Sequence, residues 1–182
     1  MPTRRELLGA AAFAFQGGRL RLSHFEGEKV VVSSGATALL EYRYATARPK
    51  SYIHPLFVDG RPVTLDGPKD HVHHRGLMVA WSEVNGIDFW GELNPARHGE
   101  IVHQRFERLR DGRSAELVSL NHWVAEGKRL LVERRTVRVG LPDGGTWLEW
   151  ITELMAADEP VKLAAGQHVY NGLGLRVVPE MD

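Results

Sequence analysis

The sequence predicts an all-β protein, an antiparallel β-sandwich, and three observations support this fold class. Apolar and polar residues alternate with a period of two along most of the chain after residue 18, as in strands that bury one face. Turn sequences that contain glycine, such as Asp59-Gly60, separate the alternating segments. No segment shows a convincing helical period, so we expect two sheets packed face to face rather than sheets covered by helices.

The first half of the chain alternates in short segments. Asp59-Gly60 and Asn85-Gly86 are dipeptides that favour tight hairpin turns, because both tolerate positive φ angles. Strands are therefore expected at residues 19–25, 29–33, 38–44, 52–58, 61–65, 77–82 and 87–91.

The second half is more regular and predicts a meander of four longer strands, followed by two short ones. These strands are expected at residues 100–109, 114–123, 129–140, 146–155, 161–164 and 172–178. Within 129–140, alternate positions carry Arg134 and Arg138, so we expect one charged face of this strand to lie in solvent. The last predicted strand stops close to Asp182, and we expect that an all-β fold of this kind lacks further strands there.

Length and composition limit the classes of function. A chain of 182 residues suits one domain, which we place at 19–182. Lysine plus arginine and aspartate plus glutamate number 23 each, which argues against nucleic acid or an anionic membrane as the main partner. The chain has no cysteine, so histidine and carboxylate groups are the metal ligands left open.

The first fifteen residues resemble a twin-arginine export signal. Arg4-Arg5 precedes an apolar run at 7–15, and Ala12-Phe13-Ala14 has the small-x-small pattern of a cleavage site. A short amphipathic helix capped by Thr3 and Glu6 is the alternative. The run is shorter than the roughly 20 residues of a membrane span, so we expect a periplasmic or secreted protein with no membrane span in the mature chain.

Three of the nine histidines fall within four positions, at His71, His73 and His74, and Arg75-Gly76 follows directly. If this segment is extended, His71, His73 and Arg75 share one face and His74 lies on the other. Imidazole can donate, accept or ligate near neutral pH. We therefore take these four residues as candidate catalytic residues that act as acid or base or grip a polyhydroxy or anionic ligand. Histidines that only bond to loop carbonyls are the alternative.

Five further residues are candidates for contacts with the ligand. Trp81 and Trp90 could stack on a sugar ring, although a packed pair between hairpin strands is an equal alternative. The substrate-binding candidates are His54, Trp81, Asp88, Trp90 and His103.

A metal site is the second hypothesis. His71 and His73, joined by His54 or His103 from neighbouring strands, could ligate zinc, copper or iron. A divalent metal is thus a possible cofactor.

Several segments together resemble a family of exported bacterial proteins called the "methane oxygenase PmoA" family. The resemblance covers about residues 52–176 and is carried by Asp70-His-Val-His-His-Arg-Gly, Val84-Asn-Gly-Ile-Asp-Phe-Trp and Tyr170-Asn-Gly-Leu-Gly-Leu-Arg. The methane monooxygenase subunit of that name is an integral membrane protein, and this sequence has no apolar run of about 20 residues after its signal. Methane oxidation is therefore not expected here.

The resemblance implies a β-sandwich similar to the galactose-mutarotase group, with a supersandwich architecture and activity on sugars. In that group a histidine acts at the sugar ring oxygen, a role that His71, His73 or His74 would take, and a carboxylate serves as base. Glu83 and Glu92 are nearby candidates for the base, which could also lie beyond Asp182. The leading expectation is a carbohydrate-active protein, epimerase-like or a sugar lyase or hydrolase; a glycan-binding module without catalysis is the third hypothesis.

Overall fold

The computed structural model describes residues 18–92, 98–142, 145–165 and 171–181. Almost every regular element in these ranges is a β-strand, as the alternating sequence predicts. The elements are β1 (Leu20–Phe25), β2 (Lys29–Ser34), β3 (Thr37–Arg43), β4 (Tyr52–Val58), β5 (Arg61–Pro62), β6 (Leu77–Trp81), β7 (Glu83–Val84), β8 (Glu100–Arg110), β9 (Ser114–Ala125), β10 (Lys128–Gly140), β11 (Trp147–Ala156), β12 (Leu163–Ala164), β13 (Asn171–Leu175) and the 3-10 turn η1 (Pro179–Met181).

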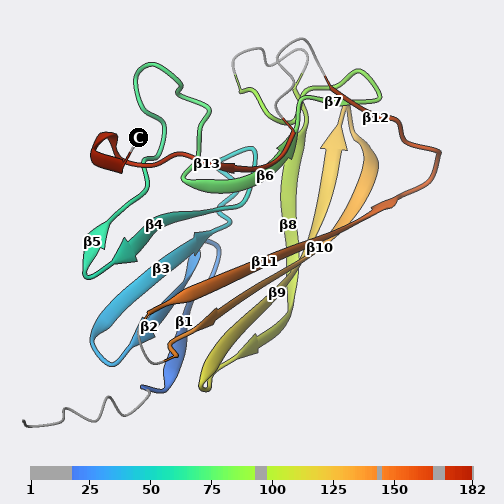
Figure 1. Ribbon diagram of the computed structural model, residues 1–182. Coiled ribbons are helices and arrows are strands. Elements are labelled where there is room, and N and C mark those ends of the chain that lie inside the picture. Colours follow the sequence, from blue (N-terminus) through green and yellow to red (C-terminus); the bar gives the residue numbers. More distant parts are fainter. Residues whose placement is uncertain (1–17, 93–97, 143–144, 166–170, 182) are drawn as a thin grey trace, which may run out of the picture.

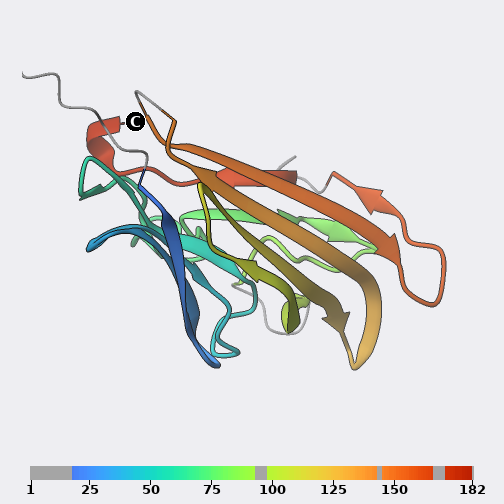
Figure 2. The same ribbon diagram turned by 90° about the horizontal axis from the view of Figure 1, so that it is seen from below.

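Most strands form two antiparallel sheets, which confirms the predicted β-sandwich, and β7 pairs with β12 in a separate two-stranded sheet. The first sheet has the order β1-β2-β3-β4-β6-β13, with β5 paired to β4, and the second has the order β11-β10-β9-β8. Figure 1 shows the first sheet in blue to green, completed by the red β13, and the second in yellow to orange. Figure 2 shows the second sheet lying against the first. No helix in the described ranges is long and apolar enough to cross a membrane.

Alternation places the core between the sheets. On β2, Val30 and Val32 are buried, whereas Val31 between them is partly exposed. Their buried neighbours come from both sheets, which makes the interior continuous across the sandwich. This part of the core consists of Leu20, Val30, Val32, Leu40, Tyr42, Tyr44, Ile53 and Leu77 from the first sheet side and Ala115, Leu117, Val137 and Val139 from the second sheet.

Charge lies on both faces of β10, and only one of them is solvated as predicted. Arg134 is exposed and pairs with Glu153 at 2.8 Å. On the opposite face, Glu133 and Arg135 are fully buried and join through Arg135 Nε to Glu133 Oε1 at 2.7 Å. The main-chain oxygen of Ser51 accepts a further bond from Arg135. These charges tolerate burial because each has a charged partner and additional hydrogen bonds.

The segment 87–91, predicted as a strand, belongs to no strand of the structure. The main-chain groups of Val84 and Ile87 bond to each other and close a turn. The carboxylate of Asp88 then accepts bonds from the amides of Trp90 and Gly91, at 2.7 and 2.9 Å. A side chain that bonds to the main chain ahead of it favours a turn over a ladder, which explains why this prediction was wrong.

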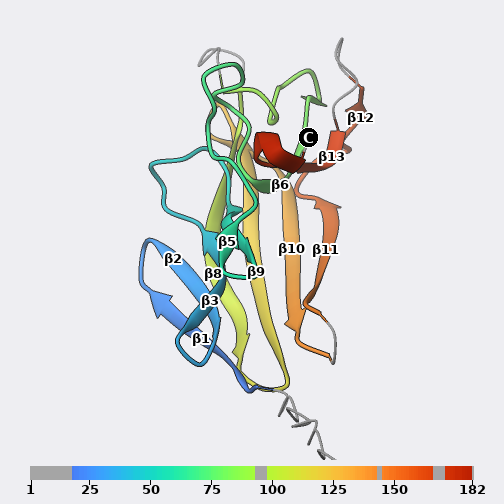
Figure 3. The same cartoon turned by 60° about the vertical axis from the view of Figure 1, so that its left-hand side comes forward.

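The long loops gather at one end of the sandwich. The loop between β5 and β6, the segment after β7, and the elements β12, β13 and η1 lie at the upper end in Figures 1 and 3. The turn between β8 and β9 lies at the opposite end. The histidine-containing loop is therefore close to segments that are distant from it in the sequence.

Candidate functional site

Residues 66–75 fold as consecutive turns rather than as an extended segment. The amide of His71 donates to the carbonyl of Pro68 at 3.0 Å, and the amide of His74 donates to that of His71 at 2.9 Å. Gly67 has a φ of +61°, which glycine adopts at little cost. The turn is closed by a bond from the Gly67 amide to the His74 carbonyl, at 2.8 Å.

These turns bring the three imidazoles together. The rings of His71 and His74 are stacked at 4.6 Å with an interplanar angle of 17°. His73 meets His74 edge to face, also at 4.6 Å. The prediction that His71, His73 and Arg75 share one strand face with His74 opposite is therefore wrong in its geometry, because the chain reverses within the segment. The prediction that the histidines form one cluster is confirmed.

Arg75 is held by carboxylates instead of being free to grip a ligand. Its guanidinium bonds to Asp66 Oδ1 at 3.0 Å and, through Nε and Nη2, to both oxygens of Glu92. Its side chain is only 7% exposed. Burial opposes the charge, but the bonds that Arg75 donates to Glu92 and Asp66 outweigh it and raise the pKa of Arg75. This fork joins the histidine loop to the segment after Trp90.

The backbone conformation and close packing of residue 76 explain why a glycine follows Arg75. Its φ is +46°, and a Cβ atom there would lie 2.2 Å from the carbonyl oxygen of Ile53. A larger residue would push the loop away from β4. The dipeptide thus holds the loop in place, because Arg75 bonds it to Glu92 and Gly76 lets it lie against β4.

Lys50 is a buried member of the same charged network that the sequence analysis missed. Its Nζ donates to the carbonyl of Trp90 at 2.5 Å and lies 3.1 Å from Glu92 Oε1. Burial lowers the pKa of Lys50, and the neighbouring Glu92 carboxylate opposes this effect. No pattern around Lys50 distinguishes it from a surface lysine.

Asp70 orients the outermost imidazole. Its Oδ2 lies 2.9 Å from His71 Nδ1 and accepts a bond from Arg176 Nη2 at 2.8 Å. The bond to His71 lowers the pKa of the Asp70 carboxyl. A carboxylate on Nδ1 fixes that nitrogen as the donor and leaves Nε2 of His71 as an acceptor.

The two inner imidazoles are neutral at pH 7. Burial, followed by the neighbouring His73 and His71, lowers the pKa of His74 to about 4. Burial also lowers the pKa of His73, and Lys50 adds to the effect. His73 Nδ1 is buried and has no hydrogen-bond partner among the described residues. A neutral imidazole offers one donor and one acceptor.

The histidine cluster opens into a pocket of about 440 Å³. Trp90, which is 9% exposed, forms a wall of the pocket rather than an open platform. The ring of Trp90 fits over β13 because Gly174 has no side chain; a Cβ atom there would lie 2.7 Å from Trp90 Cη2. The lining consists of His71, His74, Arg75, Gly76, Met78, Trp90, Asn171, Leu173, Gly174, Leu175 and Arg176.

The other residues expected at the ligand lie elsewhere. The imidazole of His54 bonds to Thr64 at 3.0 Å. His103 belongs to the second sheet and bonds to Ser119 at 2.8 Å. The carboxylate of Asp88 caps main-chain amides, and Trp81 packs against the core. Among the five substrate-binding candidates, only Trp90 lines the pocket of the histidines.

The described histidines are not arranged as a metal centre. Within the described ranges, no group of three or more histidine, aspartate or glutamate side chains is placed to hold one metal ion. His54 and His103, the expected third ligands for His71 and His73, point to hydroxyl groups instead. The donor set therefore does not fit the predicted three-histidine site.

One prediction, the export signal at 1–15, lies outside the described residues. Asn171 and Arg176 belong to the last segment of the family resemblance and line the pocket, although the sequence analysis did not name them as candidates.

Comparison with known proteins gives one match. A model of a family of unknown function (DUF6807) matches residues 29–182. No curated protein and no solved structure matches the chain.

Proposed function

The chain belongs to the family of unknown function DUF6807, and from the site itself we propose that it is an exported carbohydrate-active protein whose histidine pocket binds a neutral sugar. One observation carries this proposal: His71 and His74 open, beside Trp90, into one pocket of about 440 Å³. This volume falls within the usual range of small-molecule sites. Polar groups converging beside an apolar wall suit a ligand with hydroxyl groups on one side and C–H groups on the other.

The balance of charge favours a neutral ligand. The basic groups around the pocket already have acidic partners: Arg176 pairs with Asp70 and Arg75 with Glu92. The lowered pKa of His74 leaves that imidazole uncharged at pH 7. An acidic sugar would meet no uncompensated cation here, and burying an unpaired carboxylate is costly. Hydroxyl groups need only the donors and acceptors that neutral imidazoles supply.

His71 is the group best placed for acid–base chemistry. Asp70 holds its Nδ1, so Nε2 can accept a proton from a sugar hydroxyl or from a carbon next to a carbonyl. The resulting imidazolium is stabilised by the Asp70 carboxylate and can return the proton to the sugar. Such a step suits an epimerase-like reaction or a lyase, as the predicted resemblance to the PmoA family and the mutarotase group also implies.

The test is binding and turnover of a panel of neutral sugars and uronates. We expect a neutral sugar to bind by titration calorimetry, and His74→Ala to weaken it at least tenfold because a bond to a hydroxyl is lost. The melting temperature should change little, and Arg61→Ala, an exposed site on β5, should leave binding unchanged. Preferential binding of uronates, or binding retained in His74→Ala, would refute the proposed site.

His71→Asn separates an enzyme from a glycan-binding module. Asparagine keeps a hydrogen-bonding group but cannot take up the proton, so we expect the sugar to bind and its conversion to stop. A binding module would show no conversion with the unaltered protein either. Measuring the anomeric and epimeric composition of the bound sugar by NMR distinguishes the two.

Export is proposed from the first fifteen residues and is tested separately. We expect the full chain in the periplasmic fraction of cells, and Arg4→Lys with Arg5→Lys to retain it in the cytoplasm. Periplasmic accumulation of the double variant would contradict a twin-arginine route.

A further inference from the structure

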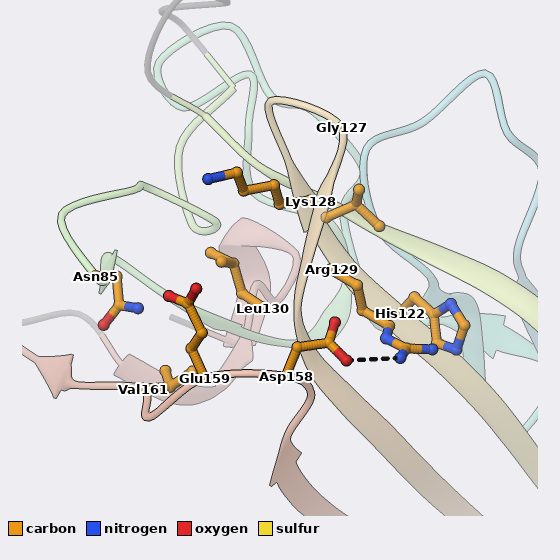
Figure 4. A pocket seen from close by; sticks show the side chains of 10 residues that line it. Asn85, His122, Gly127, Lys128, Arg129, Leu130, Asp158, Glu159 and Val161 are labelled. Carbon is orange, nitrogen blue, oxygen red and sulfur yellow. Dashed lines mark hydrogen bonds and ion pairs between the residues drawn. The ribbon is translucent and has the colours of Figure 1, made fainter.

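A second pocket, of about 540 Å³, lies apart from the histidines. It is formed where the turn between β9 and β10 meets the segment that leads from β11 to β12 (Figure 4). Leu130 and Val161 pack against the apolar core and provide its floor. None of its lining residues lines the histidine pocket, so an inference about it does not rest on the proposed function.

Three hydrogen bonds hold the walls of this second pocket in place. The amide of Ala157 donates to the carbonyl of Leu130 at 3.0 Å. At the other end of the segment, the amide of Asn85 donates to the carbonyl of Lys162 at 3.0 Å, and the amide of Lys162 donates to Asn85 Oδ1 at 2.8 Å. The segment 157–162 is thus fixed at both ends. Because it is already ordered, ligand binding would cost less conformational entropy of this segment.

Two of the four acidic and basic side chains that line this pocket have no partner of opposite charge in the part of the chain that the structure describes. Arg129 and Asp158 form an ion pair at 3.4 Å. Lys128 and Glu159 make no ion pair or side-chain hydrogen bond within the described ranges. Figure 4 shows the two side chains on the same side of the hairpin, with Leu130 between them, whereas Arg129 and Asp158 lie toward His122. The pocket therefore presents a cation and an anion on either side of an apolar side chain.

We propose that this second pocket binds a zwitterion, an α-amino acid with an apolar side chain. Its carboxylate would receive a charge-assisted hydrogen bond from Lys128, and its ammonium group would donate to Glu159. Its apolar side chain would cover Leu130 and Val161 and exclude water from them. A ligand with one charge would leave the opposite protein charge without a partner, so the pair of free groups selects for both charges on one molecule.

L-leucine is the probe, and titration calorimetry or NMR chemical shifts on the full chain provide the measurement. We expect a dissociation constant on the order of 0.1–1 mM, which is typical of so small a ligand. Lys128→Met and Glu159→Gln should each weaken leucine about tenfold or more. Both positions are exposed, so the variants should fold normally, as a melting curve can verify. Arg61→Met and Glu180→Gln, which remove the same charges elsewhere on the surface, are the matched controls and should bind leucine unchanged.

Two leucine derivatives assign each charge to its partner. Leucinamide lacks the carboxylate, so its weaker binding should no longer depend on Lys128. N-acetyl-leucine lacks the ammonium group, so its binding should no longer depend on Glu159. Absence of leucine binding up to about 10 mM, or binding that neither charge variant weakens, would overturn the proposal.

Discussion

Replacing Arg75 with methionine tests whether this arginine holds the site together or contacts the ligand. Methionine keeps the length and apolar character of the side chain and removes the guanidinium, which bonds to Asp66 and Glu92. If the fork only ties the histidine loop to the segment after Trp90, the main effect is a loss of stability. If Arg75 contacts the ligand, the main effect is a loss of binding.

The loss of stability in Arg75→Met depends on the partners that Glu92 and Asp66 keep after the guanidinium is removed. Breaking a buried ion pair costs about 3–5 kcal/mol when the other charge is left alone. Here Glu92 keeps Lys50 at 3.1 Å, and Asp66 keeps the hydroxyl of Tyr52 at 2.9 Å. Because both carboxylates retain a partner, we expect a loss of about 2–3 kcal/mol. For a chain of this length that corresponds to a decrease in melting temperature of roughly 4–12 °C.

Urea denaturation followed by tryptophan fluorescence measures this loss of stability. Titration calorimetry with a sugar that binds the unaltered protein measures the affinity of the variant for that sugar. Arg75→Lys is the matched variant, since it keeps the charge but cannot reach both carboxylates as a fork, and it should lose about 1–2 kcal/mol by the same reasoning. An unchanged midpoint with binding abolished in Arg75→Met would refute the holding role and restore Arg75 as a ligand contact.

Two further predictions concern the pocket of the histidines. Gly174→Val should displace Trp90, because even a Cβ atom at this position lies 2.7 Å from Trp90 Cη2, and should weaken sugar binding at least tenfold; an unchanged tryptophan emission spectrum and affinity would contradict it. The lowered pKa of His74, about 4 against an ordinary 6.5, means that the unfolded chain binds a proton there before the folded chain does. The stability that neutral His74 contributes is present above pH 6.5 and is lost as the pH falls through about 4. Urea midpoints between pH 7 and 4 should therefore fall less steeply in His74→Gln than in the unaltered protein. Parallel curves for the two proteins would refute the lowered pKa of His74.

The fold was predictable because its signals are local. Alternation fixes which residues of a strand are buried, and the turn dipeptides fix where most strands end, so the bounds of β8 to β11 differ by only one or two residues from those predicted. The segment 87–91 failed because a single side chain, Asp88, redirects the main chain. Burial of Glu133 and Arg135 was not predicted for a related reason: alternation shows that they share a face, but their compatibility with the core depends on the ion pair between them and on the carbonyl of Ser51.

Of the site, the sequence predicted only the histidine loop and not the residues that surround it. The density of histidines pointed to the loop, but Lys50 approaches it from the segment before β4, and Asn171 and Arg176 approach it from the far end of the chain. Spacing within a strand is also what made the metal hypothesis attractive, and the turns at Pro68 and His71 removed that spacing. Contacts between distant segments have no periodic signature in one sequence.

The charged network and the neutral imidazoles have a common cause, which is burial of the site. Lys50, Arg75, Asp66 and Glu92 are satisfied mainly within the network, so none of them has a free charge to offer a ligand. The same burial that makes this pairing necessary also disfavours protonation of His73 and His74. Acidic and basic residues thus supply rigidity, and the uncharged imidazole of His74 is left to face the pocket. A site built in this way suits the recognition of hydroxyl groups, whose position matters more than their charge.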